Sequence, residues 1–175
     1  MGIIYAGRIS NSTNMIKKIL VFLLIVLLIM QFFRPKKNIT TATPVNNIAT
    51  VYATPEDVKQ LLQVSCNDCH SNNTIYPWYA AVQPVAWWLS DHIKDGKEEV
   101  NFDEFSTYSL RRQYRKFEEI IKQVKEDEMP LSSYTWIHKD AILNAGQKQK
   151  IISWAEGIRK QMEEKYPADS LVRKK

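Results

Sequence analysis

The residues best suited to chemistry lie in one run of five. Cys66, Asn67, Asp68, Cys69 and His70 form a C-x-x-C-H motif, which contains both cysteines of the chain. On a helix the two thiols lie one turn apart, a spacing that lets both add to the two vinyl groups of one porphyrin. The histidine then lies under the iron and offers a ring nitrogen as an axial ligand. The motif therefore predicts one covalently attached haem c, bonded to Cys66 and Cys69 and ligated by His70.

Two other chemistries use a C-x-x-C pair. A thioredoxin-like dithiol requires a βαβ context, which the sequence does not predict, and it leaves His70 without a role. A zinc site needs four ligands, and Cys66 and Cys69 could be joined by His92 and His138. Those histidines are far apart in the sequence, whereas zinc motifs place two histidines about three to five residues apart. We therefore favour haem over zinc and over a redox dithiol.

The second axial position of the iron has two candidates. Met162 falls on an apolar helical stripe, whereas Met129 lies off any such stripe, directly before Pro130. We predict Met129 as the axial ligand, and a loop methionine that covers the core is the alternative. His92 is an alternative axial ligand, although a core histidine or a partner of a haem propionate is the simpler interpretation. We expect His138 to be a loop residue, or to donate a hydrogen bond to a ligand of the iron without binding the iron itself.

Helices must position these residues. The first is predicted to begin at Thr54 and to run into Cys66, so that it presents the motif. The second is predicted to begin at Pro84 and to stop at Gly96. Since no alternating strand pattern is present, the predicted fold class is all-α.

Two further helices have clear apolar stripes. The third has a regular four-and-three spacing of apolar residues, and the fourth begins after Asn144 with Gln147 at the capping-box position. The stripe of the third consists of Leu110, Tyr114, Phe117, Ile121 and Val124. The stripe of the fourth consists of Ile151, Ile152, Trp154, Ala155, Ile158 and Met162.

An apolar segment with basic flanks precedes the helices. Ile19–Met30 is wholly apolar, and no small-residue cleavage motif follows it. The longer stretch from Ile16 to Phe33 has 18 positions and reaches the lower limit of a membrane span, roughly 17–25 residues. We predict an uncleaved signal-anchor, a transmembrane helix over residues 15–33, with a cleaved signal peptide as the alternative. Met15 resembles the natural start of a signal segment. Residues 1–14, which precede it, could therefore be a mis-started N-terminus.

The rest of the chain divides by composition. We predict a linker over 34–53, a haem-binding domain over 54–165 and a flexible tail over 166–175. The net charge is +5, without the basic and aromatic stripe that nucleic acid requires, so no nucleic-acid partner is expected. One basic helix face could meet haem propionates or an anionic partner, although a solvated face is the simpler interpretation. Its residues are Arg111, Arg112, Arg115 and Lys116.

Two longer stretches resemble a known family. CNDCHSNNTIYPWYAAVQPVAWWLSDHIKDGKEEVNFDEFSTYS and EMPLSSYTWIHKDAILNAGQKQKIISWA resemble the small bacterial haem-binding domain family, whose signature is C-x-D-C-H-S-N-x-T-x-Y-P-W-Y. The resemblance extends over about Thr54–Lys160 and implies Cys66, Cys69 and His70 as haem-binding residues. It also points to Met129. Members look like exported single-domain proteins with an N-terminal anchor, or modules of larger cytochromes.

The layout is also similar to a class I cytochrome c. A helix, the C-x-x-C-H motif, a long middle, a Met-Pro loop and a terminal helix follow in that order. The aromatic loop Tyr76–Tyr79 and the Trp87-Trp88 pair depart from that class. The resemblance implies a small c-type cytochrome-like helical domain, preceded by one transmembrane helix.

These interpretations predict a membrane-anchored c-type haem protein that transfers electrons to and from unidentified redox partner proteins. Two protein ligands would saturate the iron, so an electron carrier is favoured over an enzyme. The alternative is a peroxidase-like enzyme or a gas or redox sensor with a labile sixth ligand, which would use His92 or His138. Because covalent haem attachment is extracytoplasmic, the expected location is the bacterial inner membrane, single-pass, with the haem domain in the periplasm.

Overall fold

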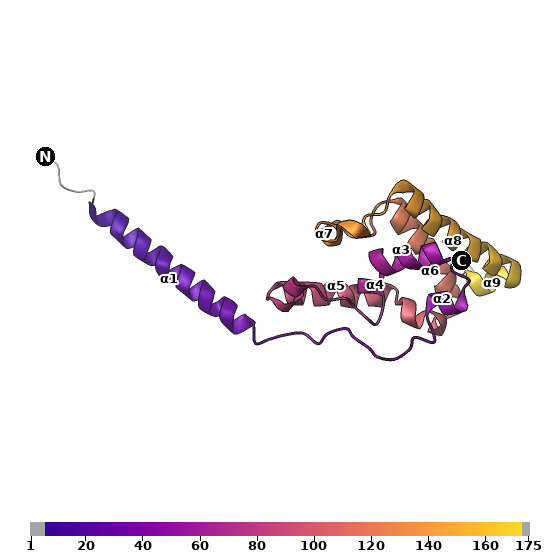
Figure 1. The fold of residues 1–175 in the computed structure, drawn as a ribbon, viewed down its shortest axis with the longest axis horizontal. Coiled ribbons are helices and arrows are strands. Elements are labelled where there is room, and N and C mark those ends of the chain that lie inside the picture. Colours follow the sequence, from indigo (N-terminus) through magenta and orange to yellow (C-terminus); the bar gives the residue numbers. More distant parts are fainter. Residues whose placement is uncertain (1–5, 173–175) are drawn as a thin grey trace. The chain divides into compact units, whose positions relative to one another are not determined.

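The computed structural model describes residues 6–172, with side chains from Thr13 onward. Every regular element in that range is a helix, so the predicted all-α class is confirmed (Figure 1). The α-helices are α1 (Ala6–Met30), α2 (Ile48–Val51), α3 (Glu56–Ser65), α4 (Asn67–His70), α5 (Val85–Glu99), α6 (Leu110–Lys125), α7 (Ser132–Thr135), α8 (Ala145–Lys165) and α9 (Ala168–Leu171). The 3-10 helices are η1 (Trp78–Ala81), η2 (Phe102–Thr107) and η3 (Lys139–Ala141).

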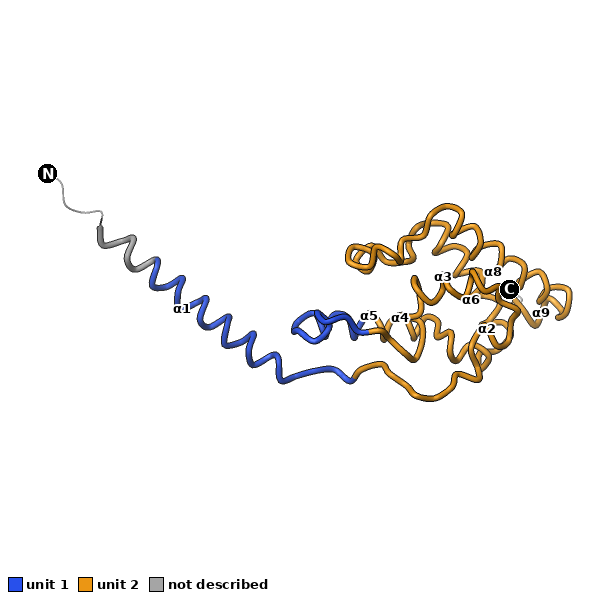
Figure 2. Tube along the Cα trace, in the orientation of Figure 1, with its two compact units in different colours: residues 1–36, 76–91 blue, residues 37–75, 92–175 orange. Residues whose placement is uncertain are grey.

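The chain divides into two compact units, coloured blue and orange in Figure 2. The first comprises residues 1–36 and 76–91, and the second comprises residues 37–75 and 92–175. Helix α5 therefore begins in the first unit and ends in the second. The predicted haem-binding domain, 54–165, contributes residues to both.

The first unit contains the predicted membrane segment. Within α1, Thr13–Met30 has a mean hydropathy of 2.2 and is long and apolar enough to cross a membrane. The predicted span, 15–33, begins inside this longer helix, which ends at Met30. Of the possible mis-started residues 1–14, residues 1–5 lie outside the described part of the chain, and α1 already includes the others.

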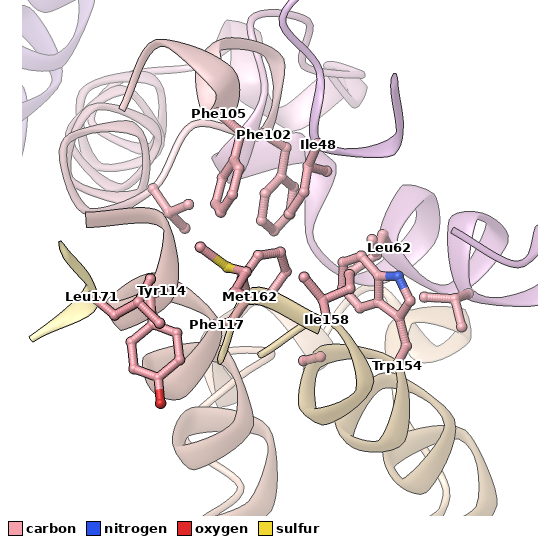
Figure 3. Packing of buried hydrophobic residues seen from close by; sticks show 13 residues of the cluster. Ile48, Leu62, Phe102, Phe105, Tyr114, Phe117, Trp154, Ile158, Met162 and Leu171 are labelled. Atoms are coloured by element: carbon pink, nitrogen blue, oxygen red, sulfur yellow. The ribbon is translucent and has the colours of Figure 1, made fainter. Parts of the chain in front are cut away.

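Helices α6 and α8 organise the second unit, and they bury the apolar stripes that the sequence predicts. Phe117 of α6 is fully buried and meets Trp154 of α8 edge to face, with ring centroids 5.7 Å apart. Figure 3 shows Phe105 and Met162 beside Phe117 in the same cluster. Truncating a buried phenylalanine to alanine costs about 3–5 kcal/mol, so this cluster is a main source of stability.

Two helix starts show how side chains fix the boundaries. Asn144 Oδ1 accepts from Gln147 N at 2.9 Å, and Gln147 Oε1 accepts from Asn144 N at 2.9 Å, which confirms the predicted capping box of α8. Helix α3 begins later than predicted, with Pro55 as its N-cap. The Thr54 hydroxyl donates instead to Tyr52 O at 2.9 Å, so it does not cap the helix.

Two segments predicted to lack structure contain packed helices. The predicted linker, 34–53, contains α2, whose Ile48 is 2% exposed in the core. The predicted tail, 166–175, contains α9, and its Leu171 is 4% exposed in the same core. A single helical turn buries only one apolar residue, which leaves no periodic pattern in the sequence. The packed structure of the second unit therefore extends beyond the predicted 54–165 boundaries.

Candidate functional site

The Cys66–His70 motif forms one helical turn after a break in the chain. Helix α3 ends at Ser65, and Cys66 leaves helical geometry with φ −132° and ψ −40°. Helix α4 follows, and His70 N donates to Cys66 O at 3.0 Å. The turn therefore carries both free thiols and the imidazole on one short element.

Burial decides the protonation of both thiols. It raises the pKa of Cys66 to about 12, with a further contribution from charge at Cys69. It raises the pKa of Cys69 to about 11, and the Asp68 carboxylate adds to the effect. Reactive dithiols have lowered pKa values, because their thiolate is the nucleophile. The pair is therefore protonated near neutral pH, unlike the thiols of a thioredoxin-like centre.

His70 is held in one orientation by its backbone partner. Its Nδ1 lies 3.0 Å from Val100 O. A proton on Nδ1 is donated to this carbonyl, which leaves the lone pair on Nε2. Burial lowers the pKa of His70, although the hydrogen bond to Val100 opposes this effect. The Phe102 ring lies 5.7 Å from the imidazole. The side chain is thus a neutral imidazole of fixed orientation, which is the form that ligates metals.

Hydrogen bonds fix the loop that follows the motif. Asp68 Oδ1 accepts from Ile75 N at 2.9 Å, and the Thr74 hydroxyl donates to Asp68 O at 2.6 Å. Asp103 Oδ2 accepts from Asn72 N at 2.8 Å. The polar residues of the C-x-D-C-H-S-N-x-T pattern therefore hold the turn and its loop together.

Two cavities, of about 260 and 230 Å³, open beside the turn. Both are lined by Ser65, Cys66, His70, Glu99 and Met129. The second is also lined by two more residues that the sequence singles out, Cys69 and His92. The fold thus gathers all five predicted site residues around one space.

The end of α6 positions Met129. Asp127 adopts a left-handed conformation with φ 62°. Glu128 N and Met129 N both donate to Gln123 O, at 3.0 and 3.2 Å. The first of these bonds is typical of a Schellman helix end. An ion pair with Lys148 also holds Asp127. The backbone of Met129 is therefore anchored to a helix, even though Met129 follows the last helical turn.

Gly96 has a different role from the one predicted. It does not stop α5, which continues to Glu99. A Cβ atom at Gly96 would lie 2.9 Å from Cys69 O and 3.1 Å from Cys69 Cβ. Glycine is therefore required for the close approach of α5 to the motif, and the prediction of a helix end here is wrong.

The two remaining histidines differ in their relation to the cavities. His92 lies on α5 and lines the second cavity. His138 lines neither cavity and stacks on the Tyr134 ring, with centroids 4.3 Å apart. Within residues 6–172, no three His, Cys, Asp or Glu side chains are grouped so that they could hold a metal ion. The ligand set considered for zinc is thus not assembled.

Lys116 is the one member of the basic helix face that lines either of the two cavities beside the turn. It is buried, and its ammonium pairs with Glu99 at 3.1 Å and with Glu119. The other members of that face line neither of the two cavities: Arg111, Arg112 and Arg115. The charge pattern alone could not separate Lys116 from its neighbours, because burial depends on what packs against α6.

Sequence reasoning missed Glu99 and Tyr134 as lining residues. Glu99 lines both cavities, and Tyr134 lines the second. The available signal for Tyr134 was the aromatic content of the loop after Met129. Glu99 carries no signal in the sequence, since it ends a helix whose last turn is rich in charged residues.

Comparison with known proteins gives one match. Residues 25–157 match the family described as haem-binding domain, and this match spans most of the chain. No curated protein and no solved structure matches.

Proposed function

The chain belongs to the haem-binding domain family, and we propose that it holds one haem c covalently and transfers electrons at the outer face of a membrane. The observation that supports this proposal is the shared lining of the cavities. Cys66, Cys69, His70 and Met129 come from two distant parts of the chain, and all line the second cavity.

The residues present fit a haem. The walls of the first cavity are largely apolar and include Leu62, Val100 and Ile120. Cysteine thiols that bond to the porphyrin, and an imidazole and a thioether that ligate the iron, are the protein groups found in c-type haem sites. A buried cation at Lys116 suits the carboxylates that a haem carries at its edge.

Each side chain has a distinct role in this proposal. The Cys66 and Cys69 thiols would bond to two vinyl groups of the porphyrin, and each thiol proton would go to the neighbouring vinyl carbon. His70 offers Nε2 to the iron, because Nδ1 is engaged by Val100 O at 3.0 Å. Met129 would offer its thioether to the iron from the loop that follows α6. The bound group would supply an iron that cycles between two oxidation states.

Electron transfer is preferred to catalysis because His70 and Met129 would both hold the iron and would leave it no open position for a substrate. A thioether ligand raises the reduction potential, since it favours the reduced iron. The proposed partners are other redox proteins, which exchange electrons without binding to the iron.

Location follows from attachment chemistry and from α1. Thr13–Met30 is apolar enough to cross a bilayer, and covalent haem attachment occurs outside the cytoplasm. We therefore propose a single-pass protein of the bacterial inner membrane with its haem domain in the periplasm. An alkaline phosphatase fusion after Lys175 should be active, and an inactive fusion with an active cytoplasmic reporter would contradict this topology.

One experiment tests the cofactor. The full chain, expressed in bacteria together with c-type haem maturation proteins, should be red, and its mass should exceed that of the polypeptide by one haem after acid extraction. The double variant Cys66→Ala and Cys69→Ala should lose this added mass. A wild-type chain with stoichiometric zinc and no haem would overturn the assignment.

His92 supports a second candidate function. It lines the same cavity as His70 and Met129. If Met129 does not hold the iron, His92 would stand beside an open or labile sixth position, as in a peroxidase-like enzyme or a gas or redox sensor. A wild-type protein that is high-spin and binds carbon monoxide at once would favour this second function.

A further inference from the structure

An uncharged aromatic segment has no part in the function proposed above. Tyr76–Ser90 contains no Asp, Glu, Lys, Arg or His, and it is rich in Trp and Tyr. Three of its tryptophans are exposed: Trp78 at 83%, Trp87 at 37% and Trp88 at 46%. Large exposed apolar clusters mark sites of contact with a partner or a membrane. We therefore expect a partner or a membrane to cover the exposed aromatic side chains of this segment.

The segment is joined to the end of the apolar helix. Gln83 N donates to Gln31 Oε1 at 3.0 Å, and Gln83 Nε2 donates to Phe33 O at 2.6 Å. Gln31 lies directly after α1, and the Gln83 side chain is almost wholly buried. The two stretches also belong to the same compact unit, drawn in blue in Figure 2. The aromatic segment is thus held where α1 would leave the hydrocarbon.

We propose that Tyr76–Ser90 is a membrane-interface element that places its tryptophans among the lipid headgroups beside α1. This inference rests on the anchor of the proposed function. Trp and Tyr are enriched at the membrane–water boundary, because their rings are apolar and carry one polar group. Phe32 and Phe33, which follow α1, are exposed apolar residues as well.

The position of the segment favours lipid as its occupant. Gln83 is hydrogen-bonded to Gln31 and Phe33, so a membrane that surrounds α1 lies next to the aromatic segment that contains Gln83. Charged residues begin only at the margins, with Arg34 after the helix and Asp91 after the segment. This order matches the depth order of a bilayer, in which aromatic residues lie between the hydrocarbon and the charged aqueous side.

Spin labels can measure this depth in the intact protein. The full-length haem protein is placed in nanodiscs of phosphatidylethanolamine and phosphatidylglycerol, with one label at Trp78→Cys or at Val82→Cys. Both positions are exposed, so a label there should not disturb buried packing. Collision with oxygen reports lipid, whereas collision with an aqueous nickel chelate reports water. A label at Leu24→Cys in α1 is the membrane reference, and a label at Glu164→Cys on the exposed charged face of α8 is the aqueous control.

The labels at 78 and 82 should have oxygen-to-nickel ratios shifted from the control towards the Leu24 reference. Aqueous ratios at both positions, with a membrane ratio at 24, would overturn this inference and leave the anchor intact. Shielding from both reagents would indicate protein contact and would overturn it too. An aqueous ratio at 24 would overturn the anchor and the inference together. Label uptake by the unsubstituted chain would contradict thioether attachment at Cys66 and Cys69. The signal of that chain would then be subtracted, and the oxygen-to-nickel ratios at 78 and 82 would still decide whether the segment lies in the membrane.

Discussion

The Tyr134 hydroxyl donates a hydrogen bond of 2.8 Å to Asp68 Oδ2 and thereby joins the loop after Met129 to the turn that carries the cysteines. Burial raises the pKa of Tyr134 far above its ordinary value, and the bond to Asp68 adds to the effect. The phenol therefore remains a neutral donor across the accessible pH range. The same Asp68 side chain also fixes Ile75 N, so one carboxylate connects three segments.

Tyr134→Phe should loosen the loop that presents Met129. Hydrogen bonds to charged groups contribute about 1.5–3 kcal/mol, so the free energy of unfolding should fall by about that amount in urea titrations. The reduced variant should also bind carbon monoxide faster than wild type, because the sixth ligand is less firmly held. Tyr166→Phe is the control, since Tyr166 lines neither cavity. Equal effects of the two substitutions would show that the Asp68 bond has no special role.

Met129→Ala should open the sixth coordination site. The variant should become high-spin, bind carbon monoxide quickly and shift to a lower reduction potential, because the thioether favours reduced iron. The oxidised wild type should show the weak near-infrared sulfur-to-iron band, and the variant should lack it. Met162→Leu is the matched control, because Met162 packs in the core and a volume-conserving change there costs less than about 1.5 kcal/mol. If the spectrum is unchanged in Met129→Ala and altered in His92→Ala, the axial ligands of the iron are His70 and His92, and Met129 is not a ligand.

Gly96→Ala and Gly157→Ala should have opposite effects on stability. Alanine in a helix interior is favoured over glycine by about 1 kcal/mol. At Gly157 of α8 an added Cβ would meet nothing within 4 Å beyond its chain neighbours and the backbone of its own helix, so the full-length protein should be stabilised. At Gly96 the Cβ would meet the Cys69 backbone at 2.9 Å, and such overpacking costs about 1–3 kcal/mol. Thermal melts and the yield of covalently attached haem measure both effects. A stabilised Gly96→Ala protein with a full haem yield would contradict the close-approach role.

In the Lys116→Met variant the free energy of unfolding should fall less in acid than it does in the wild type. The hydrogen bond from Lys116 holds the pKa of Glu99 below its ordinary value of 4.5. A carboxyl whose folded pKa is lowered contributes stability above the unfolded pKa, and this contribution disappears as the pH falls through the folded pKa. Urea titrations from neutral pH to below 4.5 should therefore show a smaller decline in the variant. The reduction potential should also fall, because two carboxylates would remain without their buried cation.

Lys150→Met provides the control for this prediction. Lys150 lowers the pKa of the exposed Asp57 by a hydrogen bond, so this variant should also lose part of the acid dependence. Lys150 lines neither cavity, and its removal should leave the haem spectrum and potential unchanged. A potential that moves equally in both variants would argue for a general charge effect.

The sequence alone determined the features that depend on near neighbours in the chain. The C-x-x-C-H spacing requires only one helical turn, and the stripe that contains Phe117 requires only the period of a helix. The capping box joins Asn144 and Gln147, which are three positions apart, and the apolar run that ends at Met30 is defined by composition. Each of these is a short-range property, so it could be read before any packing was known.

Tertiary structure decided what distant segments do to one another. Gly96 is a close contact with Cys69 and not a helix end, because only the packed fold brings α5 against the turn. Lys116 differs from the neighbouring arginines because it is buried and lines the cavity that also contains His70. Met129 and His92 both reach the space beside His70, and no periodicity could have placed them there. The physical reason is that contacts between remote residues depend on how whole helices pack, which local spacing does not specify.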